Sequence, residues 1–148
     1  MAQKSLVERL KPGEELHSAF KRIAFEGGVK AGVIASAVGS LSVANLRTAG
    51  ASEAKTIQGP LEIVSITGTL SDTGMHVHMA VSDATGKTFG GHLVPGCKVF
   101  TTVELVILDL SDEWTFNRMP DEQTTYVELD PVPKQGTKAR YEKSDTPK

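Results

Sequence analysis

The chain has 148 residues and a formal net charge of −2 at pH 7, with 16 Lys and Arg against 18 Asp and Glu. This balance excludes a general electrostatic attraction to nucleic acid or to an anionic membrane surface. The single cysteine, Cys97, excludes an intramolecular disulfide framework and any Cys-x-x-Cys metal or redox motif.

The beginning of the chain predicts a short strand followed by one amphipathic helix. The segment SLVERL (5–10) has strand character and is followed by a Pro-Gly turn. Glu14 and Glu15 come next, where carboxylates stabilise the positive end of a helix. Two consecutive glycines, at 27 and 28, end the helix. The apolar residues that recur at helical spacing are Leu16, Phe20, Ile23 and Ala24.

From there to about residue 130, the sequence predicts successive short strands. Segments rich in Val, Ile, Thr and Phe are separated by clusters of Gly, Pro, Asp and Ser. Only AGVIASAVG (31–39) is also compatible with a second helix. One early helix followed by consecutive strands predicts an α+β domain over residues 1–130, with a mostly antiparallel central sheet and one or two helices.

Residues 131–148 differ in composition from the rest of the chain. The segment PVPKQGTKARYEKSDTPK offers almost no apolar side chains to bury, so we expect a polar, disordered tail. The alternative is a weak polyanion-binding arm, because basic residues outnumber acidic ones. Its basic residues include Lys134, Lys138, Arg140 and Lys143.

No segment predicts export or membrane insertion. The N-terminal sequence lacks the long apolar stretch of a signal peptide, and no apolar run approaches the roughly 18 residues of a membrane-spanning helix. The lone cysteine favours a reducing compartment. We therefore expect a soluble, cytoplasmic protein with no membrane partner.

The segment GMHVHMAVSDATGKTFGGHLVPG (74–96) holds three of the four histidines. Val77, Met79 and Val81 alternate with His76 and His78, so the two histidines share the face directed away from the core. Whether the third histidine joins them depends on the turn that follows.

The sequence SDATGK predicts a hairpin with a three-residue loop. Asp83 suits the first position of a type I turn, and Gly86 suits the left-handed position of a G1 bulge. If Asp83 pairs with Lys87, then His78 lies directly opposite His92. A two-residue loop would instead place His92 on the opposite face.

Three histidines on one hairpin are typical of an open metal site, in which water or substrate completes the coordination of zinc. We predict that His76, His78 and His92 bind zinc or another divalent transition metal. Gly90 and Gly91 are expected to leave space for a ligand pocket, because glycine inside a strand marks a bulge or a close approach. The alternative is a polar, solvated or subunit-facing patch that holds no metal.

The run GPLEIVSITGTLSDTGMHVHMAVSDATGKTFGGHLVPGCKVFTTVELVI (59–107) resembles the plants-and-prokaryotes conserved (PPC) domain, a domain of unknown function. The resemblance extends to RLKPGEEL, ASAVGSLSVANL and FNRMPD, and covers about residues 5–130. It implies a homotrimer with a central antiparallel sheet. The fold also resembles that of acetolactate decarboxylase, where a histidine trio binds metal, and this implies the same role for His76, His78 and His92.

The resemblance also bears on DNA binding. Plant PPC domains follow AT-hook motifs in nuclear DNA-binding proteins, and stand-alone prokaryotic ones are often catalogued as DNA-binding. This chain has no AT-hook, whose core is Arg-Gly-Arg, and it is slightly acidic. We therefore do not expect direct DNA binding.

Two further residues are candidates for the pocket. Glu104, among the apolar residues of VFTTVELVILDL, is a candidate pocket residue, a partner for a histidine, an acid or base, or one half of a salt bridge across a subunit boundary. Arg118, in TFNRMPD, is a candidate to bind carboxylate or phosphate, with an ion pair to Asp121 as the favoured alternative.

These features favour a trimeric binding or regulatory module whose histidine-lined pocket holds a metal, a small ligand or a protein partner. The alternative is a zinc-dependent lyase or hydrolase that acts on a small carbonyl or carboxylate compound. In that enzyme, Glu104 would move a proton and Arg118 would hold the carboxylate of the substrate.

Overall fold

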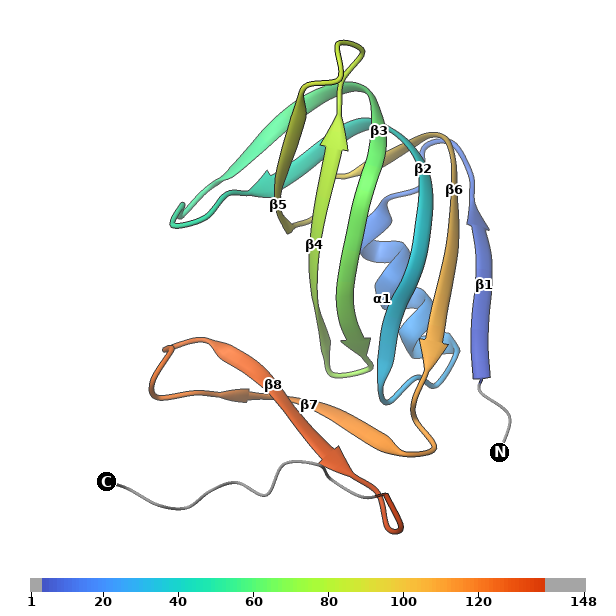
Figure 1. Ribbon diagram of the computed structural model, residues 1–148, viewed down its shortest axis with the longest axis vertical. Coiled ribbons are helices and arrows are strands. Elements are labelled where there is room, and N and C mark those ends of the chain that lie inside the picture. Colours follow the sequence, from blue (N-terminus) through green and yellow to red (C-terminus); the bar gives the residue numbers. More distant parts are fainter. Residues whose placement is uncertain (1–3, 138–148) are drawn as a thin grey trace.

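Strand β1 (Lys4–Leu10) begins the part of the chain, residues 4–137, that the computed structural model describes (Figure 1). The elements that follow are α1 (Leu16–Glu26), β2 (Gly32–Arg47), β3 (Ala54–Ser71), β4 (Gly74–Ser82), β5 (Thr88–Leu93), β6 (Lys98–Asp109), β7 (Trp114–Pro120) and β8 (Val127–Pro133). The predicted α+β class with a mostly antiparallel sheet is confirmed. Residues 32–39 belong to β2, so α1 is the single helix of the described residues.

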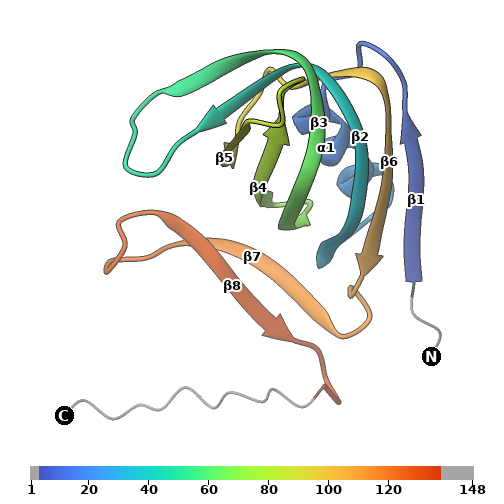
Figure 2. The same ribbon diagram turned by 45° about the horizontal axis from the view of Figure 1, so that its top comes forward.

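Six strands form the main sheet in the order β1-β6-β2-β3-β4-β5, and every neighbouring pair is antiparallel. The end of β2 makes an additional pairing with β5, where Leu46 lies opposite Leu93 and Arg47 opposite His92. Strands β2, β3, β4 and β5 are therefore linked in a closed ring of pairings, and the sheet curls strongly at this end (Figure 2).

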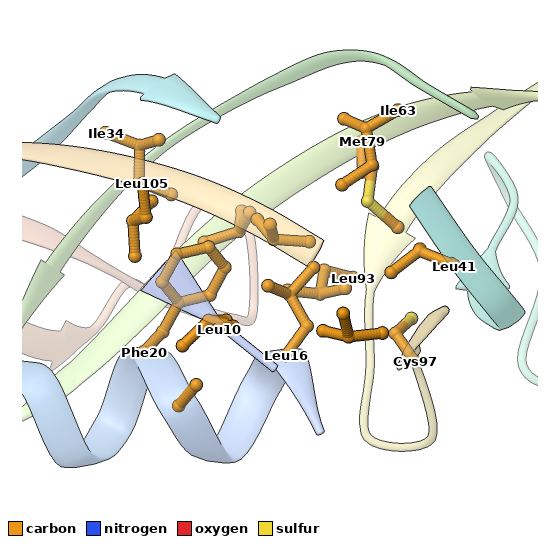
Figure 3. Close-up of a cluster of buried hydrophobic side chains, with 14 of the residues drawn as sticks. Leu10, Leu16, Phe20, Ile34, Leu41, Ile63, Met79, Leu93, Cys97 and Leu105 are labelled. Atoms are coloured by element: carbon orange, nitrogen blue, oxygen red, sulfur yellow. The ribbon is translucent and has the colours of Figure 1, made fainter. Parts of the chain in front are cut away.

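Helix α1 covers one face of the main sheet and fills the core (Figures 1 and 3). Leu16 and Phe20 are completely buried, and full burial of such a side chain contributes about 1.5–3 kcal/mol. The helix begins after Glu15, whose carboxylate accepts hydrogen bonds from the backbone N–H groups of His17 and Ser18. The pattern of apolar residues thus determines which face α1 buries, and Glu15 determines where it begins.

Strands β7 and β8 form a separate two-stranded sheet that lies beside the lower end of the main sheet (Figures 1 and 2). The Phe116 backbone ties this hairpin to the main sheet. Its N–H donates to the Lys30 carbonyl at 2.8 Å, and its carbonyl accepts from the Ser71 and Thr73 hydroxyls at 2.8 and 3.0 Å. The hairpin is therefore fixed next to β3 and the turn that leads into β4.

Strand β8 extends three residues beyond the boundary at residue 130 that the sequence predicts, since 131–133 pair with Trp114, Thr115 and Phe116 of β7. Lys138, Arg140 and Lys143, which the sequence suggests for a polyanion-binding arm, lie outside the described residues. Across 4–137, no helix is long and apolar enough to cross a membrane.

Candidate metal centre

The predicted hairpin register is confirmed, and it places His78 on β4 directly opposite His92 on β5. The Asp83 backbone N–H donates to the Lys87 carbonyl at 3.0 Å, and the Gly86 N–H donates to the Asp83 carbonyl at 2.9 Å. Gly86 has a φ of +84°, a conformation that glycine adopts without steric cost. The turn therefore sets which face of the sheet carries His92.

The three histidines converge on one point on the face of β4 and β5 directed away from α1. Their ligand nitrogens all lie within 4.8 Å of one another, and the Nε2 atoms of His76 and His78 are 3.1 Å apart. The ring of His92 lies 5.1 Å from that of His76 and 5.5 Å from that of His78, between centroids. The intervening Val77 and Met79 point into the core, as the alternation predicts.

Closure of the sheet brings Arg47 to this cluster. Arg47 is the last residue of β2, and it lies opposite His92 where β2 pairs with β5. A Cβ atom at Gly91 would approach the Arg47 carbonyl oxygen to 2.6 Å, so only glycine allows the two strands to come this close. Gly91 thus marks a close approach of backbone rather than a wall of the ligand pocket.

The β7–β8 hairpin supplies the opposite wall. A hollow of about 320 Å³ is lined by Arg47, Met75 and the three histidines on one side, and by Arg118, Tyr126, Val127 and Glu128 on the other. The Nη2 group of Arg118 donates to the Thr69 hydroxyl at 2.7 Å and to its carbonyl at 3.4 Å. Thr69 lies directly opposite His76 in the register of β3 and β4, so Arg118 is held next to the cluster.

Local electrostatics favour the neutral form of the imidazoles of His76 and His92. Burial, together with the neighbouring His78 and Arg118, holds the pKa of His76 below its ordinary value of 6.5. Burial, His76 and Arg47 lower the pKa of His92 in the same way. At neutral pH these rings therefore keep the lone pairs that a metal ion requires.

Glu104, one of the predicted pocket residues, does not lie near the histidines. Glu104 is exposed on β6, opposite Arg9 and Val38, and is not among the residues that line the histidine hollow. β6 is separated from β4 by β2 and β3, so Glu104 cannot move a proton at the cluster of its own chain. Its role in a salt bridge between subunits stays a prediction.

Gly90 also lies outside the histidine hollow. It lines a second hollow of about 500 Å³ between β2, β3 and β5, whose walls include Leu46, Ile57 and Phe89. The space expected beside the imidazoles therefore exists, but it is formed by the β7–β8 hairpin and not by the two glycines.

The predicted ion pair between Arg118 and Asp121 is wrong. The Asp121 carboxylate instead accepts hydrogen bonds from the backbone N–H groups of Gln123 and Thr124, in the turn between β7 and β8. Arg118 remains in the pocket, as its other predicted role requires.

Sequence reasoning did not single out Arg47, Tyr126 or Glu128. Arg47 reaches the site only through the long-range pairing of β2 with β5, for which no local signal exists. For Tyr126 and Glu128 the sequence does contain a signal. Both lie in TTYVEL (124–129), which predicts a strand that could pair with the segment carrying Arg118. In the structure, Arg118 pairs with Leu129, one residue after Glu128.

Comparison with known proteins places the chain in a family. The family model of the Plants and Prokaryotes Conserved (PCC) domain matches residues 1–111. Among curated proteins, the "Bifunctional protein GlmU" of Synechococcus sp. (strain JA-3-3Ab) is 47% identical over 121 residues, which are 82% of this chain and 19% of that protein. The chain therefore spans about a fifth of the length of the curated relatives it matches.

Several solved structures are also similar. A hypothetical protein from Salmonella enterica is 39% identical, with a TM-score of 0.86 over 89% of this chain and 95% of that one. A metal-containing protein from Archaeoglobus fulgidus is 30% identical, with a TM-score of 0.70 over 85% of this chain and 92% of that one.

Proposed function

Because the chain belongs to the Plants and Prokaryotes Conserved (PCC, or PPC) domain family, we propose that it is a binding module built around one divalent transition-metal ion. The observation that carries this proposal is the convergence of His76, His78 and His92. Zinc is the first candidate, since three imidazoles form a frequent zinc ligand set with an open position for water or a ligand. Iron, nickel and copper also accept imidazole.

The spacing of two of the donors fits such an ion, and the ligand nitrogen of His92 lies within 4.8 Å of them. Two nitrogens bound to a tetrahedral zinc at 2.0–2.1 Å lie about 3.3 Å apart, close to the 3.1 Å between the Nε2 atoms of His76 and His78. The lowered pKa values of His76 and His92 favour the metal-binding form of the rings. The similar protein from Archaeoglobus fulgidus, described as metal-containing, supports the same role. A bound ion would act as a Lewis acid towards an oxygen atom of a ligand.

Elemental analysis of untagged protein tests this proposal directly. We expect about one equivalent of metal per chain after incubation with zinc and removal of unbound ions, and loss of this metal when His76, His78 and His92 are all changed to Ala. The matched control is His17→Ala, which removes the fourth histidine, on α1, and should retain the metal. Wild-type protein that retains no metal would contradict the proposal.

We also propose that the module associates with copies of itself, as the family resemblance implies for a trimer. The support is three exposed apolar side chains on the face of β1, β6 and β2 opposite α1, a face that also carries the exposed Glu104. Val7, Val38 and Phe100 are 75%, 54% and 48% exposed there. Exposed apolar side chains on one face of a sheet favour burial against a partner.

Light scattering coupled to size-exclusion chromatography measures the assembly. We expect a mass of three times the 15.8 kDa of one chain, and a shift towards the monomer for the double change Val38→Lys and Phe100→Lys. Val132→Lys, at an exposed position on β8, is the control. A monomeric wild type would contradict self-association.

A binding role is preferred to the lyase or hydrolase alternative. The residue that the sequence suggests as the proton carrier of that enzyme, Glu104, lies on the outside of β6 and away from the cluster of its own chain. Direct DNA contacts are not part of the proposal, because the formal charge of the chain is −2.

A further inference from the structure

The charges around the histidine hollow point to the class of its ligand. Two arginines, Arg47 and Arg118, and one glutamate, Glu128, line the hollow, which leaves a charge of +1 with neutral histidines. A divalent ion would raise this to +3. Within residues 4–137, neither arginine forms an ion pair. The site therefore attracts anions, and more than one negative charge is needed to balance it.

Arg118 is held in a fixed position. Its Nη2 group donates to the hydroxyl and the carbonyl of Thr69, directly opposite His76. Its Nε–H is buried and has no hydrogen-bond partner in the described part of the chain. Burying one N–H donor of a guanidinium without a partner destabilises a fold. This cost is understandable if the arginine serves a ligand, since guanidinium groups bind carboxylates through paired hydrogen bonds.

The two arginines approach the cluster from different sheets. Arg47 arrives at the end of β2, opposite His92, and Arg118 arrives from β7, next to His76. Met75, Tyr126 and Val127 complete the walls, so part of the lining is apolar. At about 320 Å³, the hollow is near the lower end of the 300–1,000 Å³ typical of ligand pockets.

From these observations we propose that the metal centre binds a short organic dicarboxylate, with one carboxylate at the metal and the other at Arg118. Arg47 adds a second positive charge, and the apolar side chains contact the carbon chain. The inference rests on the proposed metal site. A bare inorganic anion would leave the apolar wall without a partner, and a monocarboxylate would leave one of the two cationic ends without a counter-charge.

The test uses full-length protein loaded with Co²⁺, whose visible absorption reports a ligand at the metal. Malonate, succinate and glutarate are titrated beside acetate and inorganic phosphate, and calorimetry gives each Kd. We expect one dicarboxylate to bind at least about tenfold more tightly than acetate and phosphate and to change the cobalt spectrum. Equal affinities for all five probes would overturn the proposal.

Variants then locate the second carboxylate. Arg118→Gln should weaken dicarboxylate binding about tenfold or more with an unchanged cobalt content, because a charge-assisted contact is lost. Thr69→Val, which removes the hydroxyl that positions Arg118, should weaken it less. Arg9→Gln, on the distant edge strand β1, is the matched control and should change the Kd less than about twofold.

The two proposals fail in different ways. If wild-type protein takes up no cobalt, the metal site and the ligand class that rests on it are both overturned. If cobalt is taken up but Arg118→Gln binds dicarboxylates like the wild type, only the ligand class is overturned. Melting curves of each variant show whether a loss of binding reflects loss of the fold.

Discussion

Gly91 packs so closely against Arg47 that a Cβ atom at position 91 would lie 2.6 Å from the Arg47 carbonyl oxygen. This contact lies where β5 pairs with β2, and it closes the ring of strands that carries the three histidines. The neighbouring Gly90 is different, because a Cβ there would meet its nearest atom, the Met79 carbonyl oxygen, at 3.5 Å.

Gly91→Ala should therefore separate β2 from β5. We expect a loss of stability of about 1–3 kcal/mol, together with weaker metal binding, because His92 moves with its strand. Gly90→Ala is the matched control and should be close to neutral. Urea unfolding of the metal-free proteins measures the first effect, and a zinc competition assay measures the second. Equal stability of the two variants would show that the close approach does not matter.

Metal affinity should fall steeply in mild acid. Zinc binds neutral imidazoles, so protons compete once the pH falls below the pKa values of the histidines. The pKa values of His76 and His92 lie below 6.5, so affinity should stay nearly constant from pH 8 to about 7 and decrease by more than about tenfold by pH 5. Competition with a chelator at several pH values gives the profile. An affinity independent of pH would exclude histidine ligands.

Glu15 should make the free energy of unfolding depend on pH, with lower stability in acid. Burial raises the pKa of its carboxyl, but hydrogen bonds from Ser18, Gly96 and His17 outweigh this effect and leave the pKa below the ordinary 4.5. The stabilisation is therefore fully present above pH 4.5 and is lost as the pH falls through the folded-state value. Glu15→Gln should cost about 1 kcal/mol at pH 7 and less at pH 3.5.

Urea titrations at both pH values check this difference. Glu53→Gln, in the exposed turn between β2 and β3, provides a control that should change stability little at either pH. If Glu15→Gln lowers the free energy of unfolding by the same amount at pH 7 and pH 3.5, the effect comes from the altered packing and hydrogen bonds of the side chain and not from its charge.

The thiol of Cys97 should react only after unfolding. Its side chain is fully buried, and burial raises the pKa to about 11. Because the thiolate is the reactive form, iodoacetamide at pH 8 should label native protein very slowly and denatured protein readily. Mass spectrometry of labelling across a urea series should follow the unfolding curve. Rapid labelling without denaturant would mean that the chain segment around Cys97 opens on its own.

Local features of the site could be predicted from the sequence. The alternation around Val77 and the Asp83–Gly86 turn act over a few residues, and together they fix the face and the register of His78 and His92. Neither step depends on distant parts of the chain, which is why single-sequence reasoning succeeds here.

The other residues of the site depend on the order of the strands in the sheet. Short stretches of sequence do not reveal this order. The segment around Glu104 alternates apolar and polar residues, as a strand that lines a pocket does. However, β6 pairs with β1 and β2, so Glu104 lies away from the histidines on β4 and β5. Arg47 arrives through closure of the sheet, and Arg118 selects Thr69 instead of the nearby Asp121. In each case the contact that forms joins residues far apart in sequence, and packing selects it.

Because β7 and β8 form a sheet of their own, one wall of the histidine hollow can vary in sequence independently of the main sheet. All three histidines belong to strands of the main sheet, whereas Arg118, Tyr126, Val127 and Glu128 belong to a hairpin with its own pairing. If the histidines hold a metal ion as proposed, the metal ligands and these four lining residues belong to different structural units. A change of sequence in the β7–β8 hairpin would then alter which ligand the hollow accepts, while the three histidines keep their positions on the main sheet.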